Sequence, residues 1–259
     1  SILVGSIIIL ITGNSPIDTF INLFDTGFTC SASGRCALLA TIQFAIPLIF
    51  TGLSATVALR ANFISLGQAG QMLLGAAAAS WIGANLDLPF PILPAVAILS
   101  AAFVAAIWAL IPAILQQYLG MNEIITTLLF NPLAVFVLGF VRVGRFPESA
   151  RLVPLIPKTK ITIGVFLALV SVGAVYLLLW KTKFGLEIRN TAQAPRFSNY
   201  GGIVNNRPIL VAILISGALA GIASAIEVLG VHYEFVSAFT AVNNFDGLII
   251  AFAGRMRPL

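Results

Sequence analysis

Polar side chains that could carry chemistry are scarce in this sequence, and most lie inside long apolar runs. They are Gln43, Gln68, Gln71, Asn122, Glu123, Asn131, Glu227 and Asp246. Polar groups at membrane depth are costly and are commonly functional. The sequence contains no G-x-x-x-x-G-K-S/T phosphate loop, no HExxH and no CxxC motif, and its single histidine is His232. We therefore expect contact with a polar solute rather than catalysis, and we expect any ATP hydrolysis on another chain.

The segment that begins at Asn122 holds the densest group of these side chains. Asn122, Glu123 and Thr126 open an apolar run, and Asn131 follows further along. On a helix, Asn122, Thr126 and Asn131 lie roughly on one side. Together with Gln71 these residues can line a hydrated path for a polar solute. The alternative is a helix cap at the start of the span, because asparagine is a favoured capping residue. Both interpretations stay open.

Two further features also allow more than one interpretation. Glu227 lies deep in an apolar run, where it can be neutral, paired with an arginine of a neighbouring helix, or the ion-binding acid of an ion-coupled transporter. Cys30 and Cys36 lie close together in a predicted outer loop. They can form a disulfide in an oxidising compartment or remain free thiols.

The link from Lys181 to Arg207 is too polar to insert into a membrane and too long for a hairpin. Ala194-Pro195 can start a short helix, because proline suits the first helical position. Phe197 and Tyr200 then share one face, and Gly201-Gly202 can end the helix. Such a helix suits the docking of a soluble partner, and an ordinary interfacial helix is the alternative.

The elements that must position these residues can be predicted from composition. The chain has 259 residues, of which 59% are hydrophobic and 9% charged, with a mean hydropathy of +1.03. A soluble domain carries roughly 25% charged residues, and disorder requires low hydrophobicity. The 14 lysines and arginines form no stripe, so nucleic acid is not an expected partner. We predict an all-α, polytopic helical bundle in a membrane.

Apolar runs predict six complete spans, with two partial spans at the ends, Ile2–Ile11 and Gly247–Gly254. The complete spans are Ala37–Leu59, Ile64–Ala84, Ile92–Leu115, Met121–Val141, Ile161–Trp180 and Pro208–Val231. This pattern favours one transmembrane domain over residues 1–259, cut within a helix at both ends. The positive-inside rule weakly favours a cytoplasmic position for Arg60 and for the Lys181–Arg207 link.

Small residues recur every four positions in two spans. They are Gly75, Ala79 and Gly83 in one, and Gly217 and Gly221 in another. Such faces allow helices to approach closely in lipid, so we expect tight packing there.

From about residue 46 to the end, ordered segments resemble those of bacterial ABC-importer permeases, nearest to the nucleoside and simple-sugar subgroup related to ribose and branched-chain amino-acid permeases. The segments are Ile46–Arg60, Gly67 with Gly70–Gly75, Asn122–Leu128, Phe184–Arg189 through Gly202–Ile203, Ala220–His232 and Phe245–Ala251. The resemblance implies a type II importer fold with inverted repeats in a bacterial inner membrane. It implies uptake of nucleosides or related simple sugars, and the alternative is an ion-coupled secondary transporter of a small polar solute.

The resemblance also implies partners. These are a cytoplasmic ABC ATPase that holds ATP and magnesium, a second permease chain (identical or different), and an extracytoplasmic substrate-binding protein. No cofactor is expected in this chain, which is a transport subunit and not an enzyme. The residues expected to couple to the ATPase are Arg189, Thr191, Pro195, Arg196, Phe197, Tyr200 and Gly202. The chain departs from the family pattern at Gln68-Ala69, Pro132, Ala194 and Arg196.

Overall fold

The computed structural model describes most of the chain. The described residues are 5–6, 9–10, 13, 15–28, 37–140, 147–155, 160–194, 198, 206–235, 245–256 and 258. Cys30 and Cys36 lie outside them, so the question of their pairing stays open.

Helices make up the regular structure of the described residues. They are α2 (Pro16–Phe28), α3 (Ala37–Arg60), α4 (Gln68–Asn85), α5 (Ile92–Leu119), α6 (Glu123–Leu138), α7 (Gly164–Lys181), α8 (Lys183–Gln193), α10 (Asn206–Glu227) and α12 (Asp246–Ala253). A short 3-10 turn covers Glu148–Ala150, and the π-turn η2 (Val228–His232) continues α10. The prediction of an all-α bundle is confirmed.

Within the described residues, four helices are long and apolar enough to cross a membrane: α3, α5, α7, and α10 together with η2. The prediction of eight crossings is therefore too high for this part of the chain. The helix α6 has 16 residues, and α4 begins at Gln68 instead of Ile64. It begins late because the chain turns at Asn62, which has a φ of 56°, and runs as an irregular segment to Gly67.

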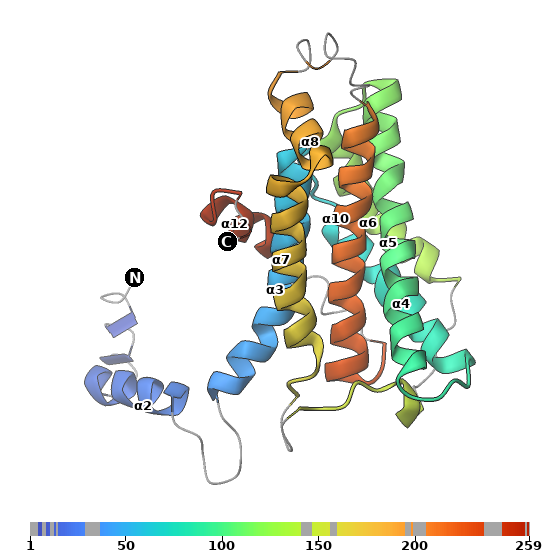
Figure 1. Cartoon of the computed structure of the whole chain (residues 1–259). Coiled ribbons are helices and arrows are strands. Elements are labelled where there is room, and N and C mark those ends of the chain that lie inside the picture. The colour runs from blue at the N-terminus through green and yellow to red at the C-terminus, as the bar shows by residue number, and fades with distance from the viewer. Residues whose placement is uncertain are drawn as a thin grey trace.

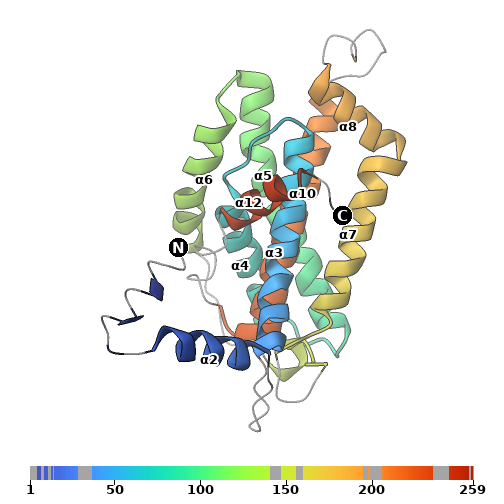
Figure 2. The same ribbon diagram turned by 90° about the vertical axis from the view of Figure 1, so that its left-hand side faces the viewer.

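The helix α10 stands at the centre of the bundle and packs against α3, α4 and α5 (Figure 1). Seen from the side, α12 lies across α3, and α2 extends away from the lower end of α3 (Figure 2). The helix α2 falls in the region Thr12–Cys36, which was predicted to be a polar link. Its spacing of Ile17, Phe20 and Ile21 is helical, and the apolar-run criterion missed it because the run is interrupted by polar residues.

Glycines allow α10 to approach its neighbours closely. A β-carbon at Gly217 would lie 2.7 Å from the carbonyl oxygen of Ala105, and one at Gly75 would lie 3.0 Å from the α-carbon of Gly221. The predicted packing role of both small-residue faces is confirmed at these positions.

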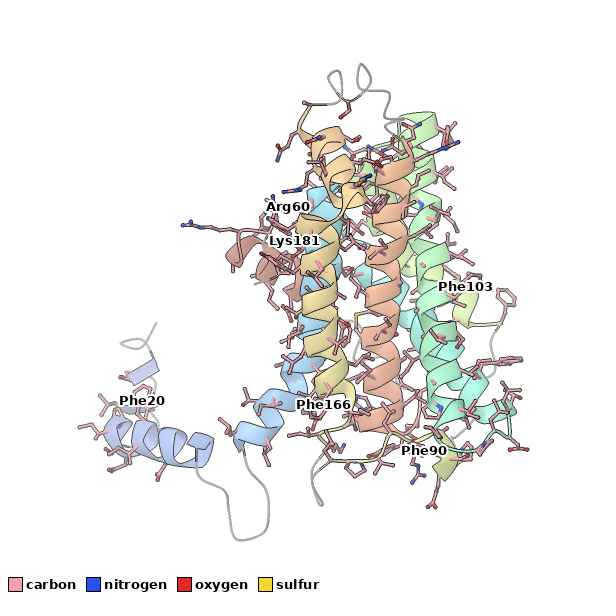
Figure 3. All side chains as sticks on the ribbon, in the orientation of Figure 1. Phe20, Arg60, Phe90, Phe103, Phe166 and Lys181 are labelled. Carbon is pink, nitrogen blue, oxygen red and sulfur yellow. The ribbon has the colours of Figure 1, made fainter. Side chains whose placement is uncertain are left out.

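Charged residues separate toward the ends of the bundle. Arg60 and Lys181 lie near the end that carries α8, whereas Phe90 and Phe166 lie near the other end (Figure 3). This arrangement agrees with the predicted grouping of Arg60 with the Lys181–Arg207 link.

Candidate functional site

The N-terminus of α6 is a capped helix end. The side-chain Oδ1 of Asn122 accepts hydrogen bonds from the backbone N–H groups of Ile124 and Ile125 at 3.0 and 3.2 Å. The hydroxyl of Thr126 donates to the carbonyl of Asn122 at 2.9 Å. The capping interpretation of Asn122 is thus confirmed. A role of Asn122, Glu123 and Thr126 in a solute path stays a prediction, because capping does not exclude it.

Further along α6, Asn131 attaches that helix to the turn before α4. Its Nδ2 donates to the carbonyl of Leu66 at 2.8 Å, and its Oδ1 accepts from the backbone N–H of Gly70 at 2.9 Å. The hydroxyl of Thr127 accepts from the N–H of Leu66 at 3.1 Å. These bonds satisfy backbone groups of the irregular segment, which has no helical partner for them.

On its other side, the start of α4 is joined to α3 by Gln68. Its Nε2 donates to the carbonyl of Thr51 at 3.0 Å and to the hydroxyl of Ser54 at 3.2 Å. The hydroxyl of Ser54 lies 3.0 Å from that of Ser216, which belongs to α10. Side chains from α3, α4, α6 and α10 therefore meet inside the bundle. We call this set the polar cluster: Thr51, Ser54, Gln68, Gln71, Asn131 and Ser216.

The polar cluster contains two unused acceptors. Gln68 and Gln71 are 1% and 2% exposed. Within the part of the chain that the structure describes, neither Oε1 atom accepts a hydrogen bond. A buried acceptor without a donor is costly, so these oxygens can bind a group that brings O–H or N–H donors. Gln71 belongs to the predicted pathway, whereas Gln68 was not assigned to it; its spacing of three from Gln71 could have indicated it.

Glu227 has a local partner. Its Oε1 lies 3.4 Å from Nε2 of His232. In an α-helix, residues five apart point in different directions, but a π-turn places i and i+5 above one another. The turn Val228–His232 is such a π-turn. The expected pairing with an arginine of a neighbouring helix is therefore wrong, because the change in helical pitch supplies a partner from the same helix.

The coupling residues predicted from the resemblance are only partly described. Arg189 and Thr191 lie on α8, whereas Pro195, Arg196, Phe197, Tyr200 and Gly202 lie outside the described residues. The helix α8 precedes the expected start at Ala194 and was not predicted. Thr182 caps it by accepting from the N–H of Gly185 at 3.1 Å. Gly185 permits the close turn from α7, since a β-carbon there would overlap the carbonyl oxygens of Leu178 and Leu179.

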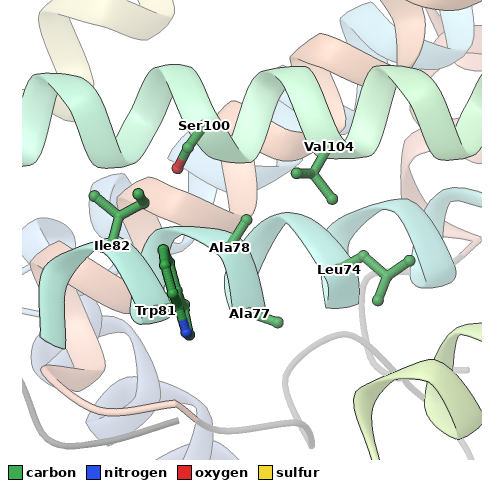
Figure 4. Close-up of a pocket in the computed structure, with 7 residues that line it drawn as sticks. All are labelled: Leu74, Ala77, Ala78, Trp81, Ile82, Ser100 and Val104. Carbon is green, nitrogen blue, oxygen red and sulfur yellow. The ribbon is translucent and has the colours of Figure 1, made fainter. Parts of the chain in front are cut away.

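A separate pocket of about 420 Å³ lies between α4 and α5 (Figure 4). It is lined by Leu74, Ala77, Ala78, Trp81, Ile82, Ser100 and Val104. The hydroxyl of Ser100 donates to the carbonyl of Ala97 at 2.8 Å. The lining is otherwise apolar, so this pocket offers little to a polar solute. Among the described residues, no group of three His, Cys, Asp or Glu residues could hold a metal ion.

Comparison with known proteins bears on the whole chain. Residues 37–259 match the family described as "Branched-chain amino acid transport system / permease component". The chain is 30% identical to the guanosine ABC transporter permease protein NupP of Bacillus subtilis, over 96% of this chain and 75% of that protein. It is 29% identical to a glucose ABC transporter permease protein of Haloferax volcanii, over 97% of this chain and 71% of that protein. It is 28% identical to a nucleoside ABC transporter permease protein, NupB of Lactococcus lactis, over 99% and 76%. No solved structure matches the chain.

Proposed function

The chain belongs to the permease-component family of branched-chain amino acid transport systems, and from this premise we propose that it is the membrane subunit of an ATP-driven importer of nucleosides or related simple sugars. The similarity to guanosine, nucleoside and glucose permeases over nearly the whole chain carries the proposal. As a family member it is a multi-pass transport component of the cell (inner) membrane and not an enzyme.

The polar cluster supports a solute of this class. Nucleosides and sugars present several O–H and N–H donors. The free Oε1 atoms of Gln68 and Gln71 are acceptors inside the bundle. In our proposal Gln71 and Asn131 lie beside the solute path, and Asn122, Glu123 and Thr126 lie at its end near α8 (Figure 1).

The energy for transport is proposed to come from partner chains. A solute with equal affinity for two states cannot drive a change between them, so another component must supply the energy. We assign this role to a cytoplasmic ABC ATPase that carries ATP and magnesium and docks on α8 and the segment after it, residues 195–202. A second permease chain and an extracytoplasmic substrate-binding protein complete the proposed importer, and this chain itself holds no cofactor.

An uptake assay tests the proposal. Cells that express the chain with its candidate ATPase and binding protein are given labelled guanosine, uridine or glucose. We expect uptake of one of these solutes that stops when the ATPase carries a substitution that blocks hydrolysis. Uptake that continues in that background would contradict the proposal.

A variant assigns the path. Gln71→Leu removes the free acceptor and should lower uptake about ten-fold, the effect of about one lost hydrogen bond. Gln43→Leu is the control, because Gln43 lies outside the polar cluster. Equal uptake by the two variants would remove Gln71 from the path.

The buried Glu227 keeps a second candidate function open, a secondary transporter that binds an ion at this carboxyl group. In that case an ionophore would abolish uptake while ATPase substitutions would not. Glu227→Gln retains the shape of the side chain and should then stop uptake. In the ATP-driven importer, the same variant should transport nearly normally.

A further inference from the structure

Two arginines from different helices share one tryptophan near the α8 end of the bundle. Trp180 lies on the last turn of α7. The Cζ of Arg60, from the end of α3, is 4.9 Å from a ring centroid of Trp180, and the Cζ of Arg189, from α8, is 5.6 Å from one. The ring of Tyr176 stacks on the same indole, with centroids 5.7 Å apart and planes 11° apart. Guanidinium groups within about 6 Å of an aromatic face are attracted by its negative potential.

This arrangement is informative because the two cations repel one another. The indole attracts both, so it offsets part of that repulsion and connects α8 to the end of α3. Arg189 also donates from Nε to the carbonyl of Gly185 at 3.3 Å, which fixes the side chain to its own helix. A movement of α8 therefore moves a charge that rests on Trp180.

Arg60 continues the contact to α12. Its Nε donates to the carbonyl of Met256 at 2.9 Å, and its Nη2 donates to that of Arg255 at 3.5 Å. These carbonyls come directly after α12 and lack a helical partner, so a cation stabilises them.

The helix α12 in turn touches the polar cluster. A β-carbon at Gly247 would lie 2.7 Å from the carbonyl oxygen of Thr51, so the two backbones are in close contact. The same carbonyl accepts the hydrogen bond from Gln68. The contacts thus run without a gap from α8 through Trp180, Arg60 and α12 to the interior of the bundle.

We propose that Trp180 is a positioning residue that transmits the movement of α8 to α12 and the polar cluster. This inference rests on the proposed function, in which a partner ATPase moves α8. A plain membrane-interface anchor is the competing role, because tryptophan is enriched at membrane surfaces. An anchor would affect stability but not the amount of solute moved per ATP.

The test uses the complete transporter with its ATPase and binding protein, reconstituted in lipid vesicles. Solute uptake and ATP hydrolysis are measured together for Trp180→Leu, Trp180→Phe and Arg189→Gln. We expect Trp180→Leu and Arg189→Gln to lower the solute moved per ATP about three- to ten-fold, as expected for loss of a coupling of about 1 kcal/mol. Trp180→Phe keeps an aromatic face and should restore part of the ratio. Trp81→Leu, on the exposed side of α4, is the control and should leave the ratio unchanged.

Three results would be decisive. A normal ratio in both Trp180→Leu and Arg189→Gln, with only a lower melting temperature, would show an anchor and overturn the inference. If Trp180→Leu does not fold, Arg189→Gln alone decides, since it leaves the indole in place. Wild-type uptake that needs no ATP would overturn the proposed function and this inference with it, and that result appears before any variant is made.

Discussion

At the scale of single residues, the two asparagines of α6 show how one side chain type serves different ends. Asn122 uses one oxygen to cap two backbone N–H groups of its own helix. Asn131 uses both ends of its amide to join a segment more than 60 positions away in the chain. The first role is local and the second depends on the fold. Substitutions should therefore affect them differently.

Asn131→Leu should destabilise the protein strongly. It leaves the carbonyl of Leu66 and the N–H of Gly70 without their partner inside the bundle, at a cost of about 1–3 kcal/mol for each group. Thermal unfolding in detergent measures the effect. Leu133→Ala, on the exposed side of the same helix, is the control and should cost far less. Similar melting temperatures for both variants would show that the amide does not hold this turn.

Asn122 allows its two interpretations to be separated. Asn122→Ala removes the cap and should cost about 1 kcal/mol, whereas Asn122→Asp keeps a capping oxygen and should retain stability. Melting temperature and uptake are measured for both. If Asn122→Asp is stable but transports poorly, the side chain also serves the solute path. If it is stable and transports normally, capping is its whole role.

At the scale of elements, close contact between helices depends on the absence of side chains. The helix α10 approaches α5 and α4 where glycine or alanine faces glycine or alanine. Association of helices in lipid relies on such packing, because apolar burial gives little advantage there. The π-turn at the end of α10 is a second device at this scale, since it changes the helical pitch and so pairs Glu227 with His232.

Gly217→Ala should separate α10 from α5. The added methyl group would lie 2.7 Å from the carbonyl oxygen of Ala105 and 2.6 Å from the β-carbon of Ala109. Overpacking of this kind costs about 1–3 kcal/mol. Gly173→Ala in α7 is a matched control, because nothing lies within 4 Å of the new atom. It should be neutral or stabilising by about 0.5–1 kcal/mol. Chemical denaturation of both variants gives the comparison, and equal losses would contradict the packing role.

At the scale of the whole molecule, the bundle has two chemically different ends. Arg60, Lys181 and α8 lie at one end, and the loop that contains Glu148 meets η2 at the other, where the N–H of Leu152 donates to the carbonyl of Leu229 at 3.0 Å. The joint at Trp180 connects the first end to the interior. An importer driven by a cytoplasmic ATPase requires that this end face the cytoplasm.

The orientation can be measured by labelling cysteines from one side. In a background with Cys30 and Cys36 replaced by serine, Lys183→Cys should react with a membrane-impermeant reagent only after the membrane is opened. Glu148→Cys should react in intact cells. The reverse pattern would contradict the orientation and, with it, docking of the ATPase on α8.

How far the sequence alone determined this protein depends on the range of each interaction. Runs of apolar residues depend only on neighbours along the chain, so they predicted the helical membrane bundle and the positions of α3, α5, α7 and α10. The cap at Asn122 and the small-residue faces are equally local, and both were predicted. The ordered motifs also indicated the permease family, which the comparisons confirm.

Only the tertiary structure decided which distant side chains meet. The rotation of each helix about its axis determines its contacts, and the apolar pattern of a buried helix specifies that rotation poorly because most faces are apolar. The union of Gln68 with Thr51 and Ser54, the two arginines on Trp180 and the attachment of Arg60 to the end of α12 therefore required the assembled bundle. The pairing of Glu227 with His232 required the π-turn, whose pitch the sequence did not reveal.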